Sequence, residues 1–149
     1  MDRQRAGRQI FLQGMALILV GLLWGFVVPH TPFPRLALTA HIQFMVNGLM
    51  LMTMGGVVLK FITQVSPRAM AIMVLAASLT WPMLMAECAN AWWGTTGILP
   101  IAAEQAGATG GQAWQELAMK ATHVLAGLAL VAAWALLTLS FARQPAERS

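Results

Sequence analysis

Polar side chains inside long apolar stretches are the residues of this sequence best placed to do chemistry. Ionisable groups are costly in hydrocarbon and usually functional there. Eight polar residues lie in three such stretches: His41, Gln43, Asn47, Glu87, Asn90, Glu116, Lys120 and His123. Imidazole can ligate haem iron, and either imidazole or a carboxyl group can transfer a proton. The sequence therefore offers ligand chemistry at His41 or His123 and proton chemistry at Glu87 or His123.

Spacing groups some of these residues on common helix faces. Glu116, Lys120 and His123 are separated by four and three positions, so they share a face, and Glu116 can pair with Lys120 in the favourable order. Glu87 and Asn90 are three apart and also share a face. His41 and Asn47 are six apart and diverge by roughly 120° on a helix of ~3.6 residues per turn. Both can line one site only if that site lies between helices.

The composition places these residues in a membrane protein. Of 149 residues, 58% are hydrophobic and only 9% are charged, whereas about a quarter of a soluble domain is charged. The mean hydropathy is +0.68 and the net charge is +4. The basic residues flank apolar stretches, which favours membrane orientation and lipid contact over nucleic-acid binding. The single cysteine, Cys88, is expected to be an inert buried thiol, and its being alone excludes an internal disulfide, a cysteine-based metal site and a CxxCH haem attachment.

Four apolar stretches predict an all-α integral membrane four-helix bundle that forms one domain over residues 1–149. Each is long enough for a hydrocarbon core that needs ~20 residues. Gly21 and Gly25 have the GxxxG spacing typical of close helix packing. The connection 94–112 is rich in Gly, Thr and Ala and is expected to be a long loop, and the first stretch is interpreted as an uncleaved span. The predicted spans are residues 10–28, 36–62, 69–93 and 113–141.

Lysine and arginine residues predict the orientation of the bundle. Three arginines precede the first span, Lys60 and Arg68 flank the second connection, and Arg143 and Arg148 follow the last span. The positive-inside rule then places both termini in the cytoplasm. In this topology the eight polar residues lie in the outer half of the bilayer, while the inner half is apolar.

Two segments give the sequence a family resemblance. GLLWGFVVPHTPFPRLALTAHIQFMVNGLM, which begins at Gly21, and ANAWWGTTGILPIAAEQAGATGGQAWQE, which begins at Ala89, resemble the bacterial hydroxylaminobenzene mutases over residues 17–117. The resemblance implies a multi-pass isomerase of the bacterial inner membrane. Its substrate would be a small arylhydroxylamine that arrives from the lipid.

A more distant resemblance is to the styrene oxide isomerases, which are also small four-helix membrane proteins. The shared elements are A-H-x5-N-G, with His41 and Asn47, and an A-N pair that ends at Asn90. This resemblance implies a homotrimer with non-covalent ferric haem b between subunits, His41 as the axial iron ligand and Asn47 in contact with the substrate oxygen. Those isomerases also have a Tyr and an Asp in the third helix. This chain has no Tyr, and Glu87 is the candidate replacement for the acid.

Both families rearrange their substrates without net redox change. The leading hypothesis is a mutase that converts an arylhydroxylamine to a 2-aminophenol, with ferric haem as a Lewis acid. Asn47 would hold the departing oxygen, and Glu87 or His123 would move the ring proton. Asn90 is the fourth candidate catalytic residue. The alternatives are an epoxide isomerase that yields an aldehyde and a non-catalytic b-type cytochrome or small transport or scaffold subunit, in which two axial histidines would close the iron.

Overall fold

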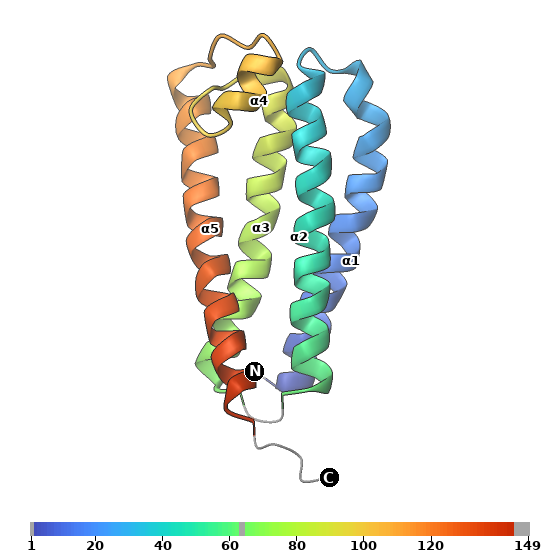
Figure 1. Ribbon diagram of the computed structural model, residues 1–149, viewed down its shortest axis with the longest axis vertical. Coiled ribbons are helices and arrows are strands. Elements are labelled where there is room, and N and C mark those ends of the chain that lie inside the picture. The colour runs from blue at the N-terminus through green and yellow to red at the C-terminus, as the bar shows by residue number, and fades with distance from the viewer. Residues whose placement is uncertain (1, 63–64, 145–149) are drawn as a thin grey trace.

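The computed structural model describes residues 2–62 and 65–144, and helices dominate this part of the chain. The long helices are α1 (Arg3–Val27), α2 (Pro34–Lys60), α3 (Pro67–Trp93) and α5 (Ala113–Ala142), and the short ones are η1 (Val28–His30) and α4 (Pro100–Gln105). The four long helices lie side by side, and both chain termini lie at the same end of the bundle (Figure 1). All four are long and apolar enough to cross a membrane. The predicted all-helical architecture with four candidate spans is confirmed.

Proline and serine mark the helix starts. Pro34, Pro67 and Pro100 each stand in the first turn of a helix, where the missing N–H costs no hydrogen bond. The Ser66 hydroxyl caps α3 by accepting a hydrogen bond from Ala69 N at 3.1 Å. The first helix starts at Arg3, before the apolar stretch that defined its predicted span, because its polar first turns continue the same helix.

The connection before α5 differs from the predicted loop, because it contains the short helix α4. This helix lies across the end of the bundle that is opposite the termini (Figure 1). Gln105 at its last turn accepts a hydrogen bond from Arg35 Nε at 2.6 Å, which ties α4 to the start of α2. Sequence analysis missed this helix of six residues, because glycines flank it on both sides and it is too short to show a helical pattern.

Glycines bring α1 and α2 into backbone contact. A Cβ atom on Gly14 would lie 2.6 Å from the Gly48 carbonyl oxygen, and one on Gly55 would lie 2.6 Å from Phe11 N. Gly7 and Gly21 extend this contact along α1 at intervals of seven residues. Close approach through small residues is the usual way to pack helices in lipid, where burial of apolar surface alone gives no preference.

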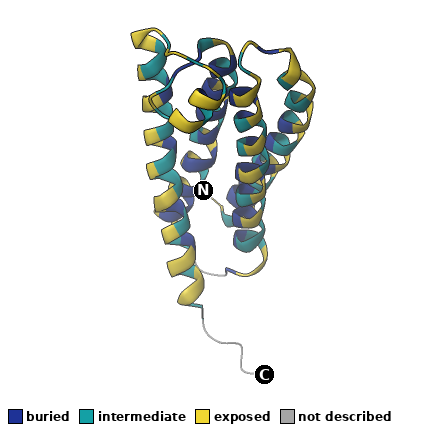
Figure 2. Cartoon of the chain, turned by 45° about the horizontal axis from the view of Figure 1, so that its top comes forward, coloured by how far each residue is buried: buried dark blue, intermediate teal, exposed yellow. Residues whose placement is uncertain are grey.

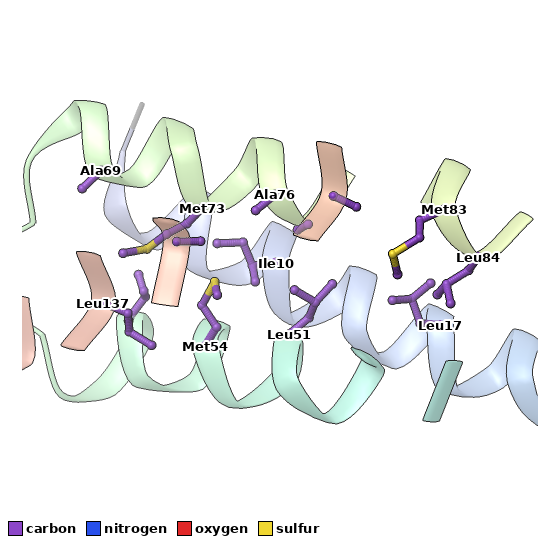
Figure 3. Packing of buried hydrophobic residues seen from close by; sticks show 14 of the residues in the cluster. Ile10, Leu17, Leu51, Met54, Ala69, Met73, Ala76, Met83, Leu84 and Leu137 are labelled. Carbon is purple, nitrogen blue, oxygen red and sulfur yellow. The ribbon is translucent and has the colours of Figure 1, made fainter. Parts of the chain in front are cut away.

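The core lies mainly between the helices at the end near the termini. Ile10, Leu51, Met54, Met73 and Leu137 converge there from four helices and are buried (Figure 3). The helices contribute unequally to the core. In the most apolar 18-residue stretch of α3 50% of the residues are buried, but in that of α5 only 17% are. Figure 2 shows the long exposed surface of α5. Thus α3 is the central helix, and α5 is a peripheral helix that packs chiefly on α3.

Candidate functional site

A buried carboxyl–imidazole pair joins α3 to α5. His123 Nε2 lies 2.8 Å from Glu87 Oε1, and the Glu87 side chain is only 1% exposed. His123 is partly exposed, and its Nδ1 lies 2.8 Å from the Met119 carbonyl oxygen one turn earlier. The two side chains are brought together by the α3–α5 packing, since 36 positions separate them in the sequence.

The contacts of His123 constrain the protons of the pair. A carbonyl oxygen only accepts hydrogen bonds, so Nδ1 carries a proton toward Met119. A further proton must lie between Nε2 and Glu87 Oε1, as imidazolium with carboxylate or as neutral imidazole with carboxylic acid. Either arrangement has zero net charge, which suits a site inside a membrane bundle. The pair therefore holds a proton that can be moved between two side chains.

Two buried polar atoms of α3, one in this pair and one about a helical turn further along, have no hydrogen-bond partner within the described part of the chain. They are Glu87 Oε2 and Asn90 Nδ2, on one face of α3. The oxygen of the Asn90 amide is occupied, because Oδ1 accepts hydrogen bonds from Thr95 N at 2.8 Å and Thr95 Oγ1 at 2.7 Å. Buried polar atoms are nearly always paired. The hydrogen-bonding capacity of this acceptor and this donor is therefore not used by the described residues.

His41 lies on a different helix pair. Its Nδ1 is 2.8 Å from the Gly21 carbonyl oxygen on α1, which assigns the Nδ1 proton to that contact and leaves the Nε2 lone pair free. The ring is partly exposed and passes over Gly25, where an added Cβ would lie 3.2 Å from His41 Cε1. A backbone carbonyl that fixes the tautomer in this way is typical of a metal-ligating histidine.

Asn47 is buried and is already engaged through its amide nitrogen. Nδ2 donates to the Gln43 carbonyl oxygen at 2.9 Å and to Gln43 Oε1 at 3.0 Å. These contacts use both hydrogens of the amide. To donate to a ligand, Asn47 must give up one of its Gln43 contacts, and the Gln43 side chain is the movable partner.

Glu116 does not form the ion pair with Lys120 that their spacing allows. Its Oε1 accepts hydrogen bonds from Thr96 N and Gly111 N at 2.9 and 3.2 Å, and its Oε2 accepts one from Gly97 N at 3.0 Å. Backbone N–H groups of the connecting segment compete successfully for the carboxylate because they converge on the first turn of α5. Lys120 is exposed, and the ion pair found among the described residues is His123–Glu87. Glu116 thus anchors the segment between α3 and α5.

The eight predicted residues therefore form several separate arrangements. The described hydrogen bonds of His41 reach α1, those of Glu87 reach α5, and those of Asn47 stay within α2. No group of three or more His, Cys, Asp or Glu side chains suited to a bare metal ion occurs in the described residues. Haem requires only one protein ligand to its iron, so His41 remains compatible with it.

Cys88 is only partly buried, contrary to the expectation of a fully buried thiol. It lies on a cleft of about 300 Å³ between α1 and α3, together with Val20, Leu23, Trp24, Val27 and Met85. The lining is almost entirely apolar. The cleft is open, so it is suited to contact with lipid chains or an apolar ring.

Sequence reasoning missed the residues that position the candidate side chains. Thr95 holds Asn90, the Gly21 carbonyl orients His41, and Gly25 leaves room for the imidazole. The GxxxG spacing of the two glycines was a signal of packing, but it did not indicate which side chain fills the space. Every residue has a backbone carbonyl, so the residue type does not show which carbonyl will orient a side chain.

Comparison of the chain with known proteins identifies its family. A family model described as styrene oxide isomerase matches residues 6–142. The chain belongs to the styrene oxide isomerase family. Within this family context, it is similar to hydroxylaminobenzene mutase HabB from Ectopseudomonas oleovorans, with 30% identity over 145 residues that cover 95% of this chain and 85% of HabB. Hydroxylaminobenzene mutase HabA from the same organism is 39% identical over 46 residues, 31% of this chain and 34% of HabA. No solved structure matches the chain.

Both predicted resemblances are confirmed. The chain is an isomerase, and its four apolar helices and family membership make it a multi-pass membrane protein. The non-catalytic alternative is left without support.

Proposed function

We propose that the protein is a mutase that rearranges an arylhydroxylamine to a 2-aminophenol. The observation that carries the proposal is the buried Glu87–His123 pair, in which Glu87 Oε2 has no partner among the described residues. In the rearrangement the N–O bond breaks and a C–O bond forms at the ortho carbon. That carbon then loses its proton, and a proton returns to a heteroatom, so the overall change is an isomerisation. A pair that holds a movable proton is suited to this exchange.

The similarity to HabB supports the substrate class. HabB is named as a hydroxylaminobenzene mutase and aligns with 95% of this chain. An epoxide isomerase that yields an aldehyde is the second candidate, and the family match over residues 6–142 favours it. Both reactions place developing positive charge on a substrate in an apolar site, where bulk water is scarce and cannot capture the cation.

The residues present fit a haem b held without covalent bonds. The free Nε2 of His41 would be its axial ligand, because Nδ1 is engaged by the Gly21 carbonyl. When bound as ferric iron, haem supplies a Lewis acid for the substrate oxygen. The partly exposed ring of His41 is consistent with haem placed between copies of the chain, in the trimer that the family resemblance implies.

The proposed roles of the other residues follow from their unused atoms. Glu87 Oε2 accepts the ring proton. The proton shared by Glu87 Oε1 and His123 Nε2 then lies on His123, which carries the positive charge. Asn90 Nδ2 donates a hydrogen bond to the departing oxygen or the amine nitrogen. Asn47 contacts the substrate oxygen after the Gln43 side chain turns away.

The membrane arrangement is also proposed. Both termini face the cytoplasm, the bilayer is the bacterial inner membrane, and a small aromatic substrate enters from the lipid. The co-location of both termini at one end of the bundle is compatible with this topology (Figure 1). A reporter fused to the C-terminus tests it, because activity of a reporter that works only outside the cytoplasm would contradict it.

The decisive experiment gives the purified protein phenylhydroxylamine and, separately, styrene oxide. We expect 2-aminophenol from the first as the main product. Phenylacetaldehyde from the second, with no aminophenol, would favour the epoxide isomerase instead. An absorption spectrum of the same preparation tests the cofactor, since a bis-histidine low-spin haem would contradict an open iron site.

A further inference from the structure

Two arginines on the first turns of α1 form a feature that the isomerase site does not use. Arg5 and Arg8 are exposed and are one helical turn apart. Neither makes a hydrogen bond or an ion pair with the described residues. This includes Asp2, the carboxylate nearest to them in the sequence. Two adjacent guanidinium groups at the end of a membrane-spanning helix therefore lack an anionic partner within residues 2–62 and 65–144.

The contacts of the neighbouring Arg3 explain why Arg5 and Arg8 point away from α2. Its guanidinium Nη1 donates to the carbonyl oxygens of Val58 at 3.0 Å and Ile62 at 2.6 Å, with a longer contact to Leu59. Arg3 thereby satisfies carbonyl groups at the C-terminal end of α2. Because Arg3 and Gly7 face α2, the helical period directs Arg5 and Arg8 away from this interface.

The same arginines border two shallow, open surface depressions, which are called clefts below. The larger has a volume of about 450 Å³ and is lined by Arg5, Arg8, Gln9, Leu12, Gln13 and Ala16. The smaller has a volume of about 320 Å³ and is lined by Gln4, Arg5, Arg8 and Leu59. The two arginines lie at the start of the larger cleft, and its apolar residues, Leu12 and Ala16, lie further along α1, with Gln13 between them. From Arg5 to Ala16 the helix rises ~16 Å, about half of a hydrocarbon core of ~30 Å.

We propose that Arg5 and Arg8 bind the phosphate of an anionic phospholipid, and that one acyl chain lies along Leu12 and Ala16. A guanidinium fork binds phosphate oxygens through paired hydrogen bonds. The apolar end of the cleft requires a ligand with a tail, which inorganic phosphate lacks. The headgroup should carry a net negative charge, because two unpaired cations attract an anionic lipid more strongly than a zwitterionic one.

Native mass spectrometry of the detergent-solubilised protein tests the proposal. Phosphatidylglycerol and phosphatidylcholine with identical acyl chains are titrated separately, and inorganic phosphate is titrated alone. The wild-type protein should retain phosphatidylglycerol in preference to the other two. The Arg5→Gln/Arg8→Gln variant should lose at least ~10-fold in phosphatidylglycerol affinity, which corresponds to ~1.4 kcal/mol.

The matched control is Arg68→Gln/Arg143→Gln, which removes the same charge from exposed residues that line neither cleft. It should change the affinity less than ~3-fold if the site, rather than net charge, binds the lipid. Equal losses in the two variants would overturn the proposal. Equal retention of phosphatidylcholine, or binding of inorganic phosphate as strong as that of the lipid, would also overturn it.

A second variant keeps the test decisive if the glutamine variant does not fold. Arg5→Lys/Arg8→Lys preserves the charge and removes the planar fork, so phosphatidylglycerol affinity should fall several-fold. Unchanged affinity in that variant would overturn the paired-guanidinium site. Isomerase activity is not the readout, so failure of this proposal is distinguishable from failure of the proposed function.

Discussion

Glu87 on α3 and His123 on α5 share a proton across a 2.8 Å contact. Glu87 is only 1% exposed, and its second carboxylate oxygen has no partner among the described residues. This relationship connects the central helix to the peripheral one, and it is the part of the molecule that the first prediction tests.

Glu87→Gln should abolish most of the isomerase activity. The amide has nearly the same shape and still forms a hydrogen bond with His123, but it cannot accept the ring proton. General acid–base contributions of this kind are about 10²–10⁴-fold in rate. Product formation from phenylhydroxylamine is the measurement, and Glu104→Gln on the exposed surface of α4 is the control. Full activity in Glu87→Gln would remove Glu87 from the mechanism.

His41→Ala should eliminate haem binding, whereas His123→Ala should leave it intact. Of the two histidines that lie within the long helices, His41 has an imidazole nitrogen free of the described contacts, whereas both nitrogens of His123 are engaged. The haem absorbance per protein in purified, monodisperse samples measures the effect. His30→Ala, in the exposed turn after α1, is the matched control. Retention of haem in His41→Ala would show that the ligand is another residue.

Gly14→Ala should destabilise the bundle by about 1–3 kcal/mol, as expected for overpacking. Its Cβ would meet the Gly48 carbonyl oxygen at 2.6 Å and Met52 N at 2.7 Å, and backbone atoms cannot move aside cheaply. Gly127→Ala in α5 is the matched control, because nothing lies within 4 Å of its added Cβ. That change should stabilise the helix by up to ~1 kcal/mol. Thermal unfolding in detergent compares the two, and equal shifts would contradict the close α1–α2 contact.

Glu116→Gln should loosen the segment between α3 and α5. The amide nitrogen cannot accept a hydrogen bond, so one of the backbone N–H groups of Thr96, Gly97 and Gly111 loses its acceptor. The free energy of local opening should fall by about 1 kcal/mol. Faster amide hydrogen exchange in this segment is the measurement. Lys120→Gln should leave exchange unchanged, and a comparable acceleration there would indicate that the ion pair allowed by the spacing matters after all.

Sequence reasoning worked where the information is local. The length of each apolar stretch is enough to predict a span, and the three-residue spacing of Glu87 and Asn90 placed them on one face of α3. The same spacing places Glu116 and Lys120 on one face of α5, but the ion pair that it allowed does not form. Sequence spacing shows which side chains are neighbours on a helix, but it does not include competing backbone donors from a folded connection.

By itself, the sequence determined four long apolar helices, the polar residues that lie within them and the family to which they belong. The tertiary structure decided that Glu87 faces His123 on α5 and that His41 faces the Gly21 carbonyl on α1. The helical period fixes the angle between residues of one helix, but not the rotation of that helix against its neighbours. In lipid this rotation is set by small-residue packing and by a few polar contacts between helices, which exist only once the bundle has formed.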